Sequence, residues 1–162
     1  MAAVEEFARV PVDPTAKAKL AEAGLRYDTL DTADAAAFDA WARADLRGFL
    51  ASEPSEKHLE GMRASLGYRR TTGVWDDTAP QNDEPVATVS SWPADLTVPG
   101  ARQLTSWAIS SVTVSQARRR RGIARNLLEG ELRTAVALGL PLSALTVSES
   151  TIYGRFGFGP AT

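Results

Sequence analysis

The residues with the clearest chemical potential are four consecutive arginines, Arg118–Arg121, followed directly by Gly122. The stretch before them, 107–114, is rich in β-branched and aromatic residues and predicts a strand. Apolar side chains recur at helical spacing from Ile123 onward, which predicts a helix that ends just before Gly139. The turn between strand and helix would present unpaired backbone N–H groups where the helix dipole favours an anion. We therefore predict a binding site for a phosphate-bearing ligand.

Small residues in this turn support the same prediction. Gly122 would let a pyrophosphate approach the backbone donors, because a side chain there would hold the ligand away. Ala124 is the next smallest residue type on the same approach. Arginines at the positive end of a helix need a negative partner, which a polyphosphate would supply. The alternative is that the basic run is only a solvated surface. A second motif is needed to distinguish this alternative from phosphate binding.

Two motifs in the right order resemble one known family. Residues 119–124, Arg-Arg-Arg-Gly-Ile-Ala, resemble the Gln/Arg-x-x-Gly-x-Gly/Ala signature of the GNAT superfamily of acetyl-CoA-dependent N-acetyltransferases. Residues 145–160, with the sequence LTVSESTIYGRFGFGP, resemble the matching segment of the Eis-like (enhanced intracellular survival) branch. The resemblance is close over 91–162, including 96–100, and is limited to the layout in the earlier half. It implies an α/β (α+β) fold with a mixed central sheet flanked by helices.

The resemblance also implies which residues bind the cofactor and which one acts in catalysis. Tyr153 matches the general-acid tyrosine that protonates the leaving thiolate, the alternative being an aromatic residue that only packs in the core. Backbone groups of Val112, Thr113 and Val114 would contact the pantetheine arm, and the N–H of Val112 or Val114 would polarise the thioester carbonyl. Glu149 matches a cofactor contact, or is a helix N-terminal acid. The cofactor-binding residues that we expect are Val112, Thr113, Val114, Arg119, Arg120, Arg121, Gly122, Ile123, Ala124, Arg125, Ser148 and Glu149.

The sequence does not identify the general base. In the Eis-like branch the resemblance implies a terminal carboxylate delivered from a third domain, whereas this chain ends at Thr162. Glu53, Glu56 and His58 are possible substitutes, but each is more typical of a surface or capping residue. Family folds continue with further strands after the tyrosine-bearing helix. We therefore expect the first part of a longer, homo-oligomeric protein, without the last strands of the sheet.

Composition and charge limit the function further. The 162 residues, 44% hydrophobic and 23% charged, are typical of one soluble domain with its own core. With no cysteine and a single histidine, the chain has no disulfide framework, thiolate metal site or histidine cluster. No apolar run has membrane-spanning length and no signal peptide is evident, so we expect a cytoplasmic protein. The net charge of −2 argues against a general nucleic-acid binder.

The other predicted elements surround this strand, turn and helix. We expect further strands at 25–30, 68–75, 85–92 and 142–147, and helices from 31 or 32 to about 50, from 55 to 66 and from 150. Residues 1–24 are predicted to form an extension with a short helix capped by Asp13 and opened by Pro14, and 25–162 to form the acetyltransferase domain. Residues 76–84 are predicted to form a polar hairpin loop and 94–103 a connection. Antiparallel strands would come first and a βαβ unit later.

Together these observations predict an acetyl-CoA-dependent N-acetyltransferase without a metal. The resemblance suggests cationic amines as substrates, such as aminoglycosides, polyamines or lysine side chains. Two alternatives stay open at this point. One is a non-catalytic acyl-CoA-binding or assembly module. The other is a nucleic-acid-binding domain that uses Arg118–Arg121, and its binding would depend strongly on salt. We expect neither a nucleic-acid nor a membrane partner.

Overall fold

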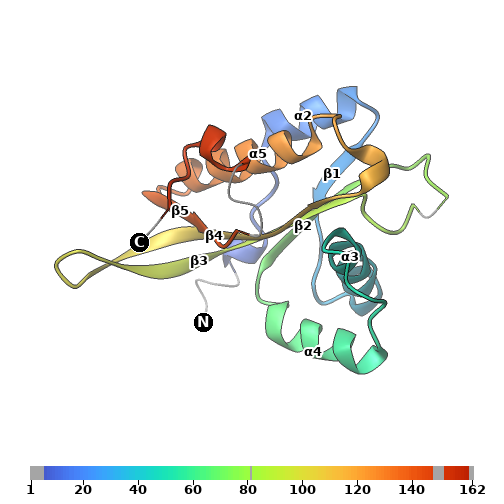
Figure 1. The fold of residues 1–162 in the computed structure, drawn as a ribbon, viewed down its shortest axis with the longest axis horizontal. Coiled ribbons are helices and arrows are strands. Elements are labelled where there is room, and N and C mark those ends of the chain that lie inside the picture. The colour runs from blue at the N-terminus through green and yellow to red at the C-terminus, as the bar shows by residue number, and fades with distance from the viewer. Residues whose placement is uncertain (1–5, 81, 148–151, 161–162) are drawn as a thin grey trace.

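The centre of the molecule is a five-stranded sheet in the order β1-β2-β3-β4-β5 (Figure 1). The computed structural model describes residues 6–80, 82–147 and 152–160. The strands are β1 (Arg26–Thr29), β2 (Arg70–Trp75), β3 (Ala87–Val98), β4 (Arg102–Val114) and β5 (Leu142–Leu145). Neighbouring strands are antiparallel from β1 to β4, and β5 is parallel to β4. This confirms the mixed sheet, with antiparallel strands first and one βαβ unit later.

Helices cover both faces of the sheet (Figure 1). Helices α2 (Pro14–Glu22) and α5 (Ile123–Ala137) pack together on one face, and α5 connects β4 to β5. On the other face, α3 (Ala35–Gly48) packs on β3 and β4, and α4 (Glu56–Leu66) packs on α3. The main core lies between the sheet and the α2–α5 layer, and a smaller apolar cluster joins α3 to α4. Among the described residues, no helix combines the length and apolar character needed to cross a membrane.

The helix caps follow the local chemistry of the sequence. Asp13 accepts a hydrogen bond from the Ala16 N–H at 2.8 Å and is followed by Pro14, as predicted for the N-terminal helix. Ser55 caps α4 in the same way, accepting from the His58 N–H at 3.3 Å. The prediction for α3 was wrong by a few residues, because Asp34 is its cap and accepts from the N–H groups of Ala36 and Ala37. The start of a helix is therefore set by which carboxylate reaches the free N–H groups.

The stretch 94–103 is not the irregular connection that was predicted. It continues β3 and β4 into a long hairpin that extends beyond the rest of the sheet (Figure 1). Pro93 lies inside β3 and has no backbone N–H to donate. The pairing of β3 with β2 ends at Ser91, so no strand on that side requires a hydrogen bond from residue 93. Smaller differences are that β1 spans Arg26–Thr29, β2 starts at Arg70, β3 starts at Ala87 and β5 ends at Leu145.

The N-terminal segment is tied to the core by a buried ion pair. Arg70 and Glu131 have side chains that are 0% exposed, and Arg70 Nη1 lies 2.6 Å from Glu131 Oε1. Arg70 also donates to the carbonyl oxygens of Val10 and Pro11 at 2.7 and 3.0 Å. Residues before α2 are thus held against β2, and α2 contributes Leu20 to the main core.

Candidate functional site

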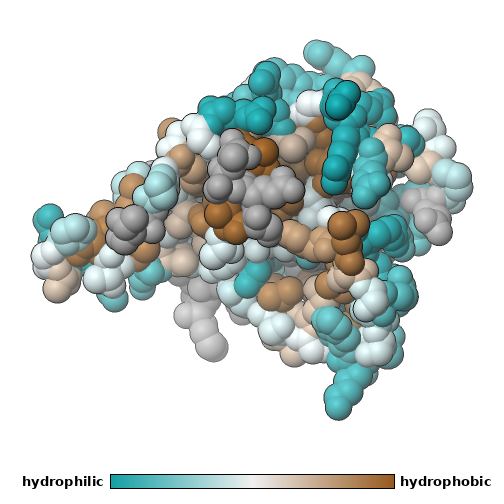
Figure 2. All heavy atoms as spheres, viewed as in Figure 1, coloured by the Kyte–Doolittle hydropathy of each residue, from teal (hydrophilic) through white to brown (hydrophobic). Residues whose placement is uncertain are grey.

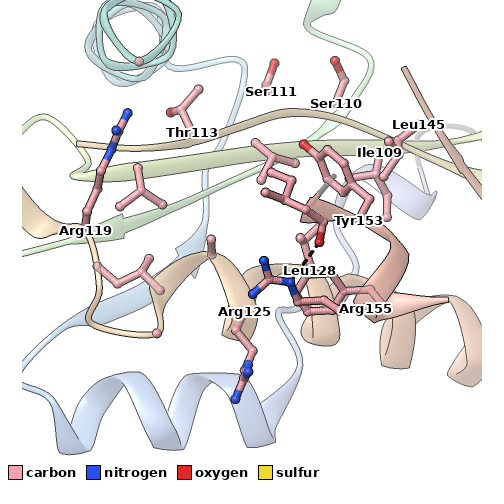
Figure 3. A pocket seen from close by; sticks show the side chains of 18 of the residues that line it. Ile109, Ser110, Ser111, Thr113, Arg119, Arg125, Leu128, Leu145, Tyr153 and Arg155 are labelled. Atoms are coloured by element: carbon pink, nitrogen blue, oxygen red, sulfur yellow. Dashed lines mark hydrogen bonds between the residues drawn. The ribbon is translucent and has the colours of Figure 1, made fainter. Parts of the chain in front are cut away.

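A cavity of about 610 Å³ runs along β4 and is the candidate site (Figure 3). We call it the β4 cavity. It lies between the C-terminal half of β4, the end of β5, the start of α5 and the segment that carries Tyr153. Its lining includes Gly48, Ser110, Ser111, Val112, Thr113, Val114, Arg119, Arg120, Gly122, Ile123, Ala124, Arg125 and Tyr153. The structure thus brings together most of the residues that the sequence indicated.

The cavity exists because β5 leaves the side of β4 early. The last pair between these strands is Ile109 with Leu145, so residues 110–114 have no strand neighbour on that side among the described residues. A strand edge of this kind presents unpaired backbone N–H and C=O groups. The side chains of Val112 and Val114 pack toward the main core while their backbone stays available. This edge suits a ligand with amide groups along an extended arm.

A β-bulge bends β4 at the middle of this open edge. The pairing register shifts between Thr88 and Ser90, so that Ser111 and Val112 on β4 oppose one residue of β3. Ser111 has a φ of 56°, a left-handed conformation that is uncommon for a residue with a side chain. Bulges bend a strand and redirect its side chains, and they occur often next to active sites. Here the bulge directs the Ser111 side chain toward the face that carries α3 (Figure 3).

The turn between β4 and α5 has the geometry of an anion site. Arg120 and Gly122 have φ values of 64° and 74°, and Gly122 is the cap of α5 without contributing a side-chain hydrogen bond. The N–H groups of residues 120–125 have no hydrogen-bond acceptor within the described part of the chain. Glycine suits position 122 because the left-handed backbone is strained for other residues. A Cβ there would meet only Asn126 Nδ2 at 3.7 Å, so the backbone conformation, more than crowding, requires glycine.

The arginines of this turn separate into different roles. Arg118 Nε donates to Asp76 Oδ2 at 2.8 Å; hydrogen bonds from Thr78, together with Arg118, hold the pKa of Asp76 below its ordinary value. Arg119 and Arg120 line the β4 cavity. Arg121, which was expected to bind cofactor, lies outside the lining and donates to the Ala23 carbonyl at 3.2 Å. Arg118 is thus already paired, and Arg121 points elsewhere.

The surface around the turn combines charge with apolar area. In Figure 2, hydrophilic side chains gather near the start of α5, and hydrophobic side chains lie on the same face of the molecule. Arg119 and Arg125 point in opposite directions in Figure 3, Arg119 toward the side of β4 and Arg125 away from it. Arg125 also lies 4.0 Å from Glu129, one helical turn later. Of these two, Arg119 is therefore the better placed to meet a ligand on β4.

Tyr153, the expected general acid, lies in the cavity wall. Its ring points toward β4 from the segment after β5 (Figure 3) and packs edge-on against Phe158 with centroids 6.2 Å apart. The described helix of this segment is a short 3-10 turn, Gly154–Phe156, which Tyr153 precedes. Ser148 and Glu149, which were expected to bind cofactor, and Ser150, the expected helix start, fall outside the described residues.

Asp45 is a buried carboxylate beside the bulge that the sequence reading did not single out. It is 6% exposed, and it accepts hydrogen bonds from Thr88 Oγ1 and Ser111 Oγ, each at 3.2 Å. Burial raises its pKa to about 6, against the opposing effects of these two hydrogen bonds and of the charge of Arg69. The sequence did contain a sign that Asp45 is buried. It lies seven residues after Phe38, on the same face of α3 as the apolar residues Phe38, Trp41 and Ala42.

The acids and the histidine considered as bases from the sequence lie elsewhere. Glu53 is 70% exposed and pairs with Arg43, and Glu56 is 67% exposed and pairs with Arg63. His58 is exposed at the start of α4. None of the three lines the β4 cavity. Within the described ranges, no group of three or more histidine, cysteine, aspartate or glutamate side chains is arranged to hold a metal ion.

Comparison with known sequences gives one family and several relatives. The family model described as an Acetyltransferase (GNAT) domain matches residues 29–161. An uncharacterized N-acetyltransferase of Streptomyces coelicolor is 34% identical over 125 residues, which are 77% of this chain and 30% of that protein. N-acetyltransferase Eis of Mycobacterium tuberculosis is 46% identical over 67 residues, which are 41% of this chain and 17% of that protein. The chain thus spans about 30% or less of the length of these relatives.

Solved structures show the same fold. Eis1 from Mycobacterium abscessus superposes with a TM-score of 0.62 at 27% identity, over 85% of this chain and 32% of that one. A predicted acetyltransferase from Clostridium acetobutylicum, solved with acetyl-CoA, gives a TM-score of 0.64 at 16% identity, over 85% of this chain and 91% of that one. At that identity the second likeness concerns the fold alone.

Proposed function

The chain belongs to the GNAT acetyltransferase family, as its two motifs indicated, and we propose that it binds acetyl-CoA in the β4 cavity and transfers the acetyl group to a primary amine. The observation that carries this proposal is the continuous path from the open edge of β4 to the turn before α5. An extended arm needs amide partners and a pyrophosphate needs N–H donors, and both lie along this path. We take aminoglycosides, polyamines and lysine side chains as the candidate amines.

The phosphate end of acetyl-CoA would be held by the turn. The unpaired N–H groups of residues 120–125 point from the N-terminus of α5, where the helix dipole adds a partial positive charge. Arg119 and Arg120 would add two formal charges at the same place. The paired Arg118 would contribute less, because Asp76 already neutralises part of its charge. This arrangement supports recognition of a polyphosphate more than of a single carboxylate.

The acyl end would lie at the bulge. Backbone N–H groups of residues 112–114 are the candidates to polarise the thioester carbonyl as negative charge develops on its oxygen. Tyr153, on the opposite wall, would donate a proton to the departing thiolate. A phenol with a reference pKa near ~10 and a thiol near ~8.5 are close enough for this transfer. The amine must reach the carbonyl uncharged, because an ammonium has no lone pair.

Calorimetric titration with acetyl-CoA tests the binding step. Arg119→Ala and Arg121→Ala remove the same charge from the same turn, but only Arg119 lines the cavity. We expect Arg119→Ala to weaken binding clearly more than Arg121→Ala, and both affinities to fall with rising salt. Equal losses for the two variants would mean that the turn attracts the ligand only through its net charge. No binding to the folded chain would contradict the proposed function.

Thiol release on addition of a polyamine or an aminoglycoside tests the transfer step. Tyr153→Phe should leave acetyl-CoA affinity unchanged and slow thiol release by ~10²-fold or more, the usual range for a lost general acid. Binding without thiol release in the unmodified chain would support a non-catalytic acyl-CoA-binding module instead. A Tyr153→Phe variant with undiminished transfer would remove Tyr153 from the catalytic role.

A further inference from the structure

Hydroxyl groups cluster around Asp45 on the face of the sheet that carries α3. Ser111 Oγ donates to Asp45 Oδ2 at 3.2 Å. Thr88 Oγ1 lies 3.2 Å from Asp45 Oδ1 and 2.8 Å from the Ser111 carbonyl oxygen, and its one proton can go to either acceptor. Thr88 Oγ1 and Thr113 Oγ1 are 2.6 Å apart, and either of them can be the donor. These contacts connect α3, β3 and β4 at the bulge. Asp45 of α3 is therefore held by hydroxyls from two strands.

Two more serines extend the cluster along the sheet. Ser90 and Ser110 are directly opposite each other in the β3–β4 ladder, so their side chains share a face. Ser90 is 1% exposed, and its Oγ has no hydrogen-bond partner among the described residues. A buried hydroxyl without a partner is costly. Ser90 is not part of the lining of the β4 cavity, whereas Ser110 is.

The β4 cavity reaches this cluster. Ser110, Ser111 and Thr113 belong to its lining, together with Gly48 at the end of α3. Asp45 is not part of the lining, and it lies one hydrogen bond behind Ser111. The cavity is thus bounded by the anion-binding turn at one end and by hydroxyls backed by a carboxylate at the other. A cationic ligand would prefer the second end.

We propose that Ser111 and Asp45 form the amine subsite of the β4 cavity, where Ser111 Oγ accepts a hydrogen bond from the amine and Asp45 receives the amine proton through Ser111. The class of substrate is a small diamine or polyamine that presents a primary amine. This inference rests on the proposed acetyl transfer. Asp45 is a positioning residue in this scheme, because it acts through the Ser111 hydroxyl and does not touch the amine.

The proton balance of the step is complete. The amine nitrogen forms a bond to the acetyl carbon, and the bond from that carbon to sulfur breaks. As the nitrogen loses its proton to Ser111 Oγ, the hydroxyl gives its own proton to Asp45 Oδ2. The sulfur takes a proton from Tyr153. Asp45 and Tyr153 then return to their starting states by exchange with solvent.

The charges around Asp45 suit this role. From β3 and β4 the facing groups are the hydroxyls of Thr88, Ser111 and Thr113. The charged group that influences Asp45 is Arg69, just before β2. Its positive charge lowers the pKa of the Asp45 carboxyl, but the opposite effect of burial is larger. Arg69 is itself held over the ring of Trp92, with its guanidinium carbon 3.8 Å from the ring centroid. A carboxyl with a pKa of about 6 is ionised at neutral pH and is more basic than an exposed aspartate.

Three other buried or partly buried carboxylates are less suited. Glu131 is fully buried on the opposite face and is locked by Arg70, and Glu84 is paired with Arg47 at 2.7 Å outside the β4 cavity. Asp39 lies on the same helix as Asp45, but it pairs with Arg63 from α4. Asp39 therefore offers a matched control, since it is a partly buried aspartate of α3 that pairs with Arg63, whereas Asp45 is hydrogen-bonded to Ser111 of the cavity lining.

Carbon-detected NMR of the 162-residue chain, with aspartate labelled at the carboxyl carbon, tests the subsite without requiring turnover. The Asp45 signal is assigned by its loss in Asp45→Asn. We expect its titration midpoint to fall when 1,3-diaminopropane is added to the CoA-loaded chain, because a bound ammonium favours the carboxylate. The Asp39 signal should stay in place, and Ser111→Ala should weaken the response. An Asp45 midpoint that is the same with and without the diamine would overturn the proposal.

The pH dependence of acetyl transfer provides a second readout that a purely structural role would not move. In the unmodified chain the rate should fall as the pH drops through about 6, where Asp45 becomes protonated. Asp45→Asn should lower kcat by ~10²-fold and remove this acidic limb, while Asp39→Asn should retain it. A retained limb in folded Asp45→Asn would overturn the proposal. Absence of transfer from the unmodified chain would count against the proposed function, and the Asp45 titration would still decide the amine subsite.

Discussion

Gly48, the last residue of α3, packs against Thr113 of β4 so closely that a Cβ at position 48 would lie 2.4 Å from the Thr113 Cβ. Both residues line the β4 cavity, and Thr113 belongs to the hydroxyl cluster around Asp45. The absence of a side chain at Gly48 therefore sets how near α3 comes to the bulge. This close approach lets a carboxylate on a helix contact hydroxyls on two strands.

Replacing Gly48 by alanine should destabilise the protein, although alanine is the better helix former. The added Cβ must displace Thr113 or the end of α3, and overpacking of this kind costs about 1–3 kcal/mol. Gly61→Ala is the matched control, because Gly61 lies inside α4 with nothing within 4 Å of an added Cβ. That variant should gain up to about 1 kcal/mol. Denaturant unfolding of both variants measures the difference, and equal shifts would contradict the tight contact.

The ion pair between Arg70 and Glu131 should be one of the most sensitive points of the core. Glu131 also accepts hydrogen bonds from Trp107 Nε1 at 2.9 Å and from the Tyr27 hydroxyl at 3.4 Å. Burial, with Glu131 next in importance, raises the pKa of Tyr27 above its ordinary value. Glu131→Ala would leave the Arg70 charge without its partner, and we expect a loss of about 3–5 kcal/mol in unfolding free energy.

An exposed ion pair gives the contrast for this prediction. Lys17 and Asp28 are 3.2 Å apart with side chains 49% and 43% exposed, so Lys17→Ala should cost no more than about 1 kcal/mol.

Because Arg70 also holds the carbonyls of Val10 and Pro11, Glu131→Ala should make the segment before α2 more susceptible to proteolysis. Unfolding midpoints and cleavage rates measure the two effects. An unchanged cleavage rate would mean that Arg70 holds the segment without Glu131.

Gly122 should matter for binding beyond its effect on stability. Gly122 and Gly139 have φ values of 74° and 71°, and they flank the two ends of α5. Alanine at either position should cost about 1–2 kcal/mol of stability through backbone strain. Only Gly122→Ala should also lower acetyl-CoA affinity, by ~10-fold or more, because Gly122 belongs to the turn that presents N–H groups to the cavity and Gly139 does not line it. Calorimetry on both variants tests this, and parallel losses of affinity would refute the role of the turn.

Local chemistry made much of the fold predictable from the sequence. The apolar spacing after Ile123 and the β-branched run before Val114 indicated α5 and β4, and Asp13 indicated the start of α2. The family resemblance then implied a mixed central sheet flanked by helices. The long β3–β4 hairpin was not predicted, because Pro93 reads as a strand breaker unless the open edge beside it is known.

The candidate site was predicted only where its residues are adjacent in the chain. The turn and Tyr153 came from motifs, and the structure places both on one cavity. Asp45 and Ser111 are 66 residues apart, and only the bulge and the close approach of α3 bring them together. Arg121 shows the reverse case, since a run of arginines does not indicate which of them points away.

Asp45 should give the protein a distinctive dependence of stability on pH. Its pKa rises from 3.8 when the chain is unfolded to about 6 in the folded state, so the folded state binds the proton more tightly. Stability from this group is therefore greatest below pH 3.8, and it is lost as the pH rises through about 6. The loss is at most about 3 kcal/mol, from ~1.4 kcal/mol per pKa unit.

Asp76, whose pKa is lowered, acts in the opposite direction, so its contribution to stability is lost as the pH falls. The test is therefore the difference in unfolding free energy between the unmodified chain and Asp45→Asn, which cancels Asp76. This difference should decline from pH 4 to pH 7, and a flat difference would show that Asp45 is hydrated in the folded state.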